Sequence, residues 1–99
     1  DWAAIADRYA LLAAVTGSPV VELSRAVAVA EVDGPEAALR IVDGLELDGF
    51  HYLHATRAEL LHRLGRGEDA VRACHRALEL VRDEGERRHL ERRLRDYAS

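Results

Sequence analysis

The feature that most constrains the fold of this chain is an internal repeat with a spacing of 32 residues. When the sequence is shifted by 32 positions, Ser24-Arg25-Ala26 aligns with Thr56-Arg57-Ala58. The next segment aligns as well: Glu36 with Glu68, Ala38 with Ala70, Arg40 with Arg72, and Val42 with Cys74. A period in this range is typical of arrays of helical hairpins, in which each hairpin buries its apolar face against a neighbour. The repeat therefore predicts an all-α fold.

Glycine and proline residues divide the chain into six segments with helical periodicity. We expect helices over residues 1–16, 19–32, 35–44, 50–64, 68–82 and 86–97, with Gly85 as the last break and no strand. Small residues allow antiparallel helices to approach closely, and they recur where the repeat requires it: Ala26, Ala38, Ala58, Ala70 and Ala77. The first segment is expected to be the second helix of a preceding repeat, with its apolar residues Trp2 and Ile5 exposed.

This pattern resembles the tetratricopeptide repeat, which implies about six helices in a right-handed stack. Two positions depart from that pattern. The aromatic residue expected early in the first helix of each repeat is Glu22 in one copy and His54 in the other, and the closing proline is Arg82.

Length and composition favour one small domain over residues 1–99. The single cysteine, Cys74, excludes an internal disulfide and fits a reducing, cytoplasmic compartment. No apolar run approaches the roughly 20 residues that span a bilayer, so no membrane contact is expected. The chain begins at Asp1 and contains no methionine, and we expect it to be part of a longer protein.

Three strings carry a more specific resemblance: residues 18–35 (SPVVELSRAVAVAEVDGP), 49–61 (GFHYLHATRAELL) and 86–93 (ERRHLERR). In order and spacing they resemble the C-terminal helical-repeat extension of extracytoplasmic-function (ECF) RNA polymerase sigma factors. The resemblance implies a longer protein with two upstream sigma domains, whose activity this segment modulates. The implied partners are those sigma domains, RNA polymerase, or a small DGPF-motif signalling protein. A general tetratricopeptide-type scaffold unrelated to transcription remains an alternative.

Arg25 and Arg57 occupy equivalent positions, one residue before a close-packing alanine. First helices line the concave face of such arrays, so both arginines could hold a carboxylate of a partner through paired hydrogen bonds. The alternative is an ion pair within the chain, with Glu22 or Glu59 as the acceptor.

His51 and His54 lie three residues apart, and His62 lies two turns further on. A metal site would need more ligands in matching geometry, and no such set is evident. We therefore expect His54 to fill the aromatic position between helices and His51 to cap the helix or face solvent. Cys74 is expected in an apolar stripe, where a thiol acts as a small apolar side chain.

Arginines gather near the C-terminus, with Arg87 and Arg88 as candidate partner contacts alongside Arg92, Arg93 and Arg95. They alternate with acidic residues at steps of three and four, a pattern that favours ion pairs along one helix. We expect no direct nucleic-acid contact, although an auxiliary DNA-contacting domain is an alternative. No nucleophile elbow, phosphate-binding glycine loop or carboxylate pair is present, so neither an enzyme nor a cofactor is expected.

Overall fold

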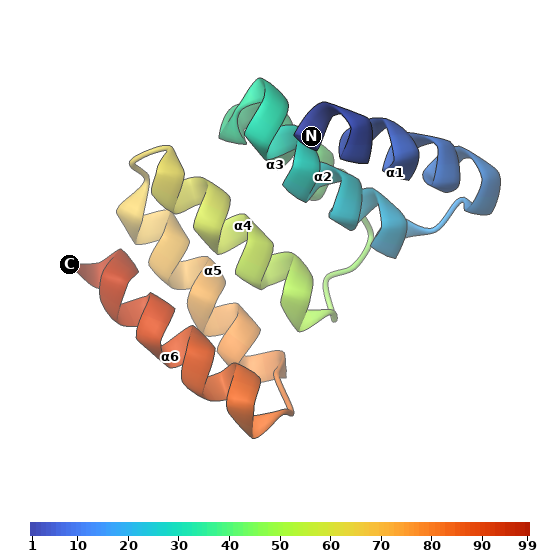
Figure 1. Ribbon diagram of the computed structural model, residues 1–99. Helices are drawn as coiled ribbons and strands as arrows, with labels where there is room; N and C mark the ends of the chain where they lie inside the picture. Colours follow the sequence, from blue (N-terminus) through green and yellow to red (C-terminus); the bar gives the residue numbers. More distant parts are fainter. The chain divides into compact units, whose positions relative to one another are not determined.

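The computed structural model describes all 99 residues and consists of six α-helices without a strand, which confirms the all-α prediction (Figure 1). The helices are α1 (Trp2–Thr16), α2 (Pro19–Asp33), α3 (Pro35–Asp43), α4 (His51–Arg63), α5 (Gly67–Leu80) and α6 (Glu84–Ala98). None of them is both long and apolar enough to cross a membrane.

The turn between α1 and α2 forms as its residues predict. Gly17 closes α1 in the left-handed region, at φ 65° and ψ 16°, where a residue without Cβ is favoured. The hydroxyl of Ser18 accepts a hydrogen bond from the backbone N–H of Val21 at 3.4 Å, and Pro19 occupies the first helical position.

The last helix boundary differs from the prediction, because Gly85 lies inside the first turn of α6. The break falls earlier, since α5 ends at Leu80 and Val81 is extended. Asp83 then starts α6, as its carboxylate accepts a hydrogen bond from the backbone N–H of Glu86 at 2.8 Å. An acidic N-cap determines this boundary more strongly than the glycine does.

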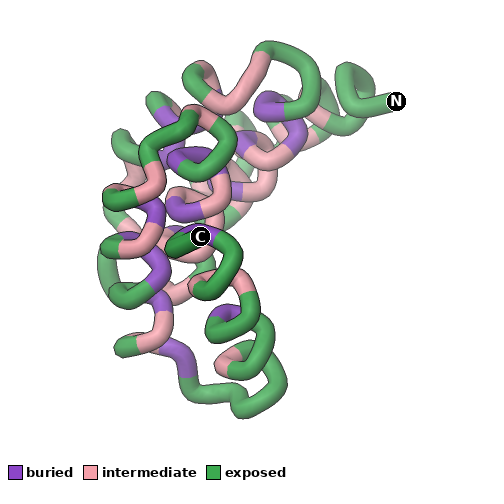
Figure 2. The backbone as a smooth tube through the Cα atoms, turned by 90° about the vertical axis from the view of Figure 1, so that its left-hand side faces the viewer, coloured by how far each residue is buried: buried purple, intermediate pink, exposed green.

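The chain forms two compact units, residues 1–47 with α1–α3 and residues 48–99 with α4–α6. In the first unit α2 packs against both α1 and α3, and in the second α5 packs against both α4 and α6. The two units differ in how their first helices are covered. Leu53, Leu60 and Leu61 of α4 are buried, whereas no residue of α1 is buried (Figure 2).

The 32-residue register is present in the structure. The helices α2 and α4 begin 32 residues apart, at Pro19 and His51, and α3 and α5 do so at Pro35 and Gly67. The close-packing alanines are fully buried in both copies: Ala26, Ala38, Ala58 and Ala70. The half-buried Ala6 of α1 stands 32 residues before Ala38, which identifies α1 as the counterpart of α3 and α5.

Some apolar residues of the first two helices lie at the surface. Leu12 and Val15 of α1 are exposed, because α1 packs against α2 alone, and Val20 of α2 is exposed as well. The exposure of Trp2 and Ile5 confirms the prediction for this end of the chain.

Replacing Ala58 by Leu should lower the free energy of unfolding by about 1–3 kcal/mol, because the larger side chain overpacks the contact between α4 and α5. Urea denaturation of Ala58→Leu measures this change. Ala98→Leu, at an exposed position of α6, is the matched control and should leave stability nearly unchanged. Equal stability of Ala58→Leu and the unmodified chain would contradict the assigned interface.

Candidate partner-binding surface

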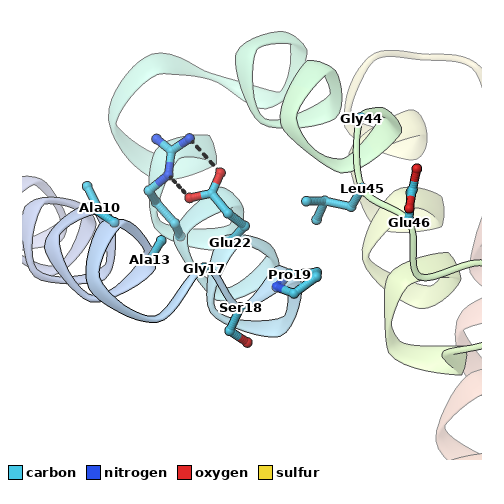
Figure 3. A pocket seen from close by; sticks show the side chains of 11 residues that line it. Ala10, Ala13, Gly17, Ser18, Pro19, Glu22, Gly44, Leu45 and Glu46 are labelled. Atoms are coloured by element: carbon cyan, nitrogen blue, oxygen red, sulfur yellow. Dashed lines mark hydrogen bonds and ion pairs between the residues drawn. The ribbon is translucent and has the colours of Figure 1, made fainter.

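The first unit contains an open hollow of about 580 Å³ (Figure 3). Its lining comes from α1, from the turn before α2, from α2 itself and from the residues that follow α3. These residues are Ala10, Ala13, Ala14, Gly17, Ser18, Pro19, Glu22, Arg25, Gly44, Leu45 and Glu46. Small side chains line the α1 side of the hollow. The alanines of α1 leave the space next to α2 unfilled, and this space is the hollow.

The Arg25–Glu22 ion pair supplies charged groups within the hollow. The Nε of Arg25 donates to Oε1 of Glu22 at 2.8 Å, and its Nη2 donates to Oε2 at 3.1 Å. Both side chains stay partly exposed, at 26% and 31%. The hydrogen bonds from Arg25 lower the pKa of the Glu22 carboxyl, although partial burial opposes that shift. The alternative of an ion pair within the chain is thus realised for Arg25.

This pair leaves Arg25 able to bind a second acceptor. A guanidinium carries five N–H donors, and the bonds to Glu22 occupy two of them. A carboxylate on a partner would share Arg25 with Glu22, and the Glu22 charge would oppose it. Because Glu46 also lines the hollow, its three charged side chains carry a net charge of −1, and an acidic group could be held there only through the remaining N–H donors of Arg25.

In the second repeat, the equivalent positions behave differently. His54 stands where Glu22 stands in the first copy, and its Nε2 lies 2.7 Å from the carbonyl oxygen of Asp48. His54 therefore holds the loop before α4, rather than filling an aromatic position between helices. Arg57 is half-buried on α4, at the position equivalent to Arg25. Glu59 is bound by other residues, described below.

His51 and His62 lie in different contacts of the second unit. The Nε2 of His51 lies 2.9 Å from Oε2 of Glu86, so His51 links α4 to α6 instead of capping α4 or facing solvent. The His62 ring lies 5.0 Å from the Tyr97 ring, measured between centroids. No group of three histidine, cysteine or acidic side chains is placed to hold a metal ion.

Cys74 is buried, and its Sγ lies 3.5 Å from the carbonyl oxygen of Leu90. Burial raises the pKa of this thiol, although the charge of Arg93 opposes the shift. A thiol held neutral in this way is a poor nucleophile, and Cys74 serves as a packing residue between α5 and α6.

A polar network at Glu59 joins α4 to α6, and sequence reasoning did not find it. The Glu59 carboxylate accepts hydrogen bonds from the guanidinium of Arg93, from the Tyr97 hydroxyl at 3.0 Å and from Nε of Arg63 at 3.2 Å. Burial opposes ionisation of Glu59, but the bonds from Arg93 and Tyr97 outweigh it and lower its pKa. Burial also raises the pKa of Tyr97 to about 12.

The C-terminal arginines divide into two groups. The Nη2 of Arg87 donates to the carbonyl oxygen of Val81 at 3.1 Å and so closes the end of α5. The expected ion pairing along α6 is limited to Arg93 with Asp96, at 3.2 Å. The other three arginines of α6 are exposed and make no ion pair: Arg88, Arg92 and Arg95. Of the two candidate contacts, only Arg88 therefore presents an uncommitted charge.

Comparison with known proteins gives a partial match. No family model matches the chain, and no solved structure does. An uncharacterized protein of Rhizobium meliloti (strain 1021) is 41% identical to it over 101 residues. The match covers 100% of this chain and 24% of that protein. The chain thus spans about a quarter of the length of this relative.

Replacing Glu59 by Gln should destabilise the second unit by about 1–2 kcal/mol at pH 7, because Arg93 loses its charged acceptor while Tyr97 keeps a neutral one. Since the folded pKa of Glu59 is lowered, its contribution is complete above the unfolded value of about 4.3 and is lost as the pH falls through the folded value. The stability difference between the chain and Glu59→Gln should therefore shrink as the pH drops below about 4.

Denaturant titrations at pH 7, 5 and 3 measure this difference. Glu91→Gln, an exposed residue of α6 without an ion pair, is the control and should not change stability at any of these pH values. A Glu59→Gln effect that is independent of pH would show that the carboxylate charge is not what stabilises the contact.

Proposed function

We propose that this chain is a regulatory, protein-binding segment of an ECF RNA polymerase sigma factor. The resemblance of residues 18–35, 49–61 and 86–93 to the C-terminal extensions of that family supports this assignment. The observation that carries the protein-binding part is the hollow of the first unit. It is open, small side chains line its α1 side, and it holds a partly exposed arginine together with Glu22 and Glu46.

The chemistry of the hollow suggests what the partner offers. An acidic residue with short apolar neighbours would place its carboxylate at Arg25 and its apolar atoms over Ala10 and Ala13. The partner is one of the parent's own sigma domains or RNA polymerase, with a small DGPF-motif protein as a signalling partner. These proteins act in the cytoplasm, and so would this segment.

Regulation then takes the form of a switch between docked and released states. Such a switch needs a signal that binds the two states with different affinity, because a ligand with equal affinity shifts no population. The Arg25–Glu22 pair suits such a switch. Glu22 already accepts hydrogen bonds from two N–H groups of Arg25, and this competition limits the affinity for the partner in the docked state.

The test is binding of this chain to the purified sigma domains of its parent and to core RNA polymerase. Arg25→Ala should weaken binding about tenfold, because a charge-assisted contact is lost. Glu22→Gln should strengthen binding or leave it unchanged, because the competing carboxylate is removed while Arg25 remains. Isothermal titration calorimetry measures both changes.

Arg40→Ala is the matched control, since Arg40 is an exposed arginine of the same unit outside the hollow. If Arg25→Ala and Glu22→Gln weaken binding equally, the pair is structural and the hollow is not the contact. Absence of binding to both the sigma domains and the polymerase would favour a general scaffold unrelated to transcription.

An auxiliary DNA contact is the second candidate, because Arg88, Arg92 and Arg95 form an exposed stripe at i, i+4 and i+7 without ion pairs. The second unit holds eleven arginines and ten acidic residues, so its net charge is only +1. A balance so close to neutral releases few phosphate counterions.

We therefore expect no measurable affinity for duplex DNA at 50 mM salt in a fluorescence anisotropy titration with this chain. Binding that falls steeply with salt, and that is lost when Arg88, Arg92 and Arg95 are replaced by Ala, would establish the DNA-contacting function instead.

A further inference from the structure

The outer face of α1 is apolar and exposed. Five large apolar residues of this helix lie at the surface, and two of them are almost uncovered: Leu11 at 70% and Val15 at 84% exposure. Leu12 and Ile5 are exposed beside them on the helix, whereas the exposed Trp2, in the first turn, lies on the opposite side of α1. Exposed apolar side chains gathered on one helix mark contact surfaces in soluble proteins.

Stacking of a further repeat does not account for this face. In the 32-residue register, the covered positions of α5 are Ala70, Cys74 and Ala77, which correspond to Ala6, Ala10 and Ala13 of α1. Packing within the array therefore uses the alanine side of α1, which lies toward α2 and the hollow. The positions of Leu11, Leu12 and Val15 correspond to exposed residues of α5, namely His75, Arg76 and Glu79. Hence α1 is apolar at positions where its counterpart is polar and solvated.

Arg8 is the charged residue of a seam along this face. The equivalent arginines of α3 and α5 form ion pairs with carboxylates on their own helices, and Arg8 does not. The equivalent arginines are Arg40, which pairs with Glu36 at 3.6 Å, and Arg72, which pairs with Asp69. The positions of those two carboxylates are occupied in α1 by Ala4 and Ile5. Arg8 is exposed and makes no ion pair.

We propose that the outer face of α1 docks an amphipathic helix of a protein partner, with an acidic residue in its apolar stripe that pairs with Arg8. Ala4, Arg8, Leu11 and Val15 follow one another at steps of four, three and four residues, which places them in one straight seam along α1. A partner helix that carries apolar residues at the same spacing would cover the seam, and its carboxylate would replace the ones that α1 lacks. This surface is separate from the hollow at Arg25.

Charge argues against two other occupants. In a pair of α1 helices from two copies, the four seam positions hold no acidic residue, so neither Arg8 side chain would meet a carboxylate from the seam of the other copy. An anionic lipid surface is disfavoured because the first unit holds eight acidic residues and three arginines, a net charge of −5.

Calorimetry with designed peptides makes the proposal directly measurable. The probes are two designed helical peptides of 15 residues that share a Leu and Ala stripe and differ only in a central Glu or Lys. Isothermal titration calorimetry of the chain with each peptide should show at least about tenfold tighter binding of the Glu peptide. Arg8→Glu should reverse that preference.

Three variants act as controls. Leu11→Glu combined with Val15→Glu should abolish binding of both peptides, and because both residues are exposed, the circular dichroism spectrum should not change. Arg40→Glu, at the equivalent position of α3, and Arg25→Ala, in the hollow, should leave peptide binding unaltered. Since the second of these variants weakens binding in the proposed sigma-factor contact, failure of one proposal is distinguishable from failure of the other.

Absence of binding by either peptide, or equal affinity for both, would overturn the proposal. Sedimentation velocity of the chain alone should show a monomer; a dimer that Leu11→Glu dissociates would assign the face to a second copy instead. Binding to vesicles with anionic headgroups that Arg8→Glu removes would assign it to a membrane surface.

Discussion

The structure depends on the close approach of paired helices at buried alanines. Ala26 and Ala38 are fully buried on α2 and α3, and Ala58 and Ala70 are fully buried on α4 and α5, 32 residues later. A methyl group at these positions sets the helix separation, and any larger side chain would force the helices apart. Since both hairpins are built around the same small residues, the remaining positions of each helix are free to diverge. That divergence generates the surfaces on which the functional proposals rest.

The two units differ in the contacts that hold their outer helices. In the second unit, α6 is held against α4 by polar contacts at both ends, through His51 with Glu86 and through Glu59 with Arg93 and Tyr97. In the first unit, α1 offers alanines where a bulky neighbour would otherwise fill the space, and the hollow at Arg25 remains open. The second unit is thus closed by polar contacts, whereas the first unit keeps an open flank.

Patterns that repeat or punctuate the sequence were predictable, whereas contacts between distant side chains were not. The repeat register, the helix order and the Gly17-Ser18-Pro19 turn follow from local chemistry that acts within a few residues. The boundary at Asp83 differs from the prediction because the Asp83 carboxylate caps the helix two residues before Gly85. The Glu59 network joins residues 34 and 38 positions apart, and no periodic signal marks it. Likewise, the position of Glu86 opposite His51 arises only from the way α6 packs.

The helix α1 shows most clearly how a repeat can be used for two purposes. Its alanine side keeps the repeat register, as Ala6 stands at the position of Ala38 and Ala70. On its outer side, the residue types differ from those at the equivalent positions of α5 at Ala4, Leu11, Leu12 and Val15. Arg8 is an arginine like its equivalents Arg40 and Arg72. Folding of the hairpins requires only the alanine side, so it gives no reason for the apolar residues on the outer side. Exposed leucine and valine side chains carry a cost in water that a contact would remove. The retained arginine among them favours a surface that supplies an anionic acceptor such as a carboxylate.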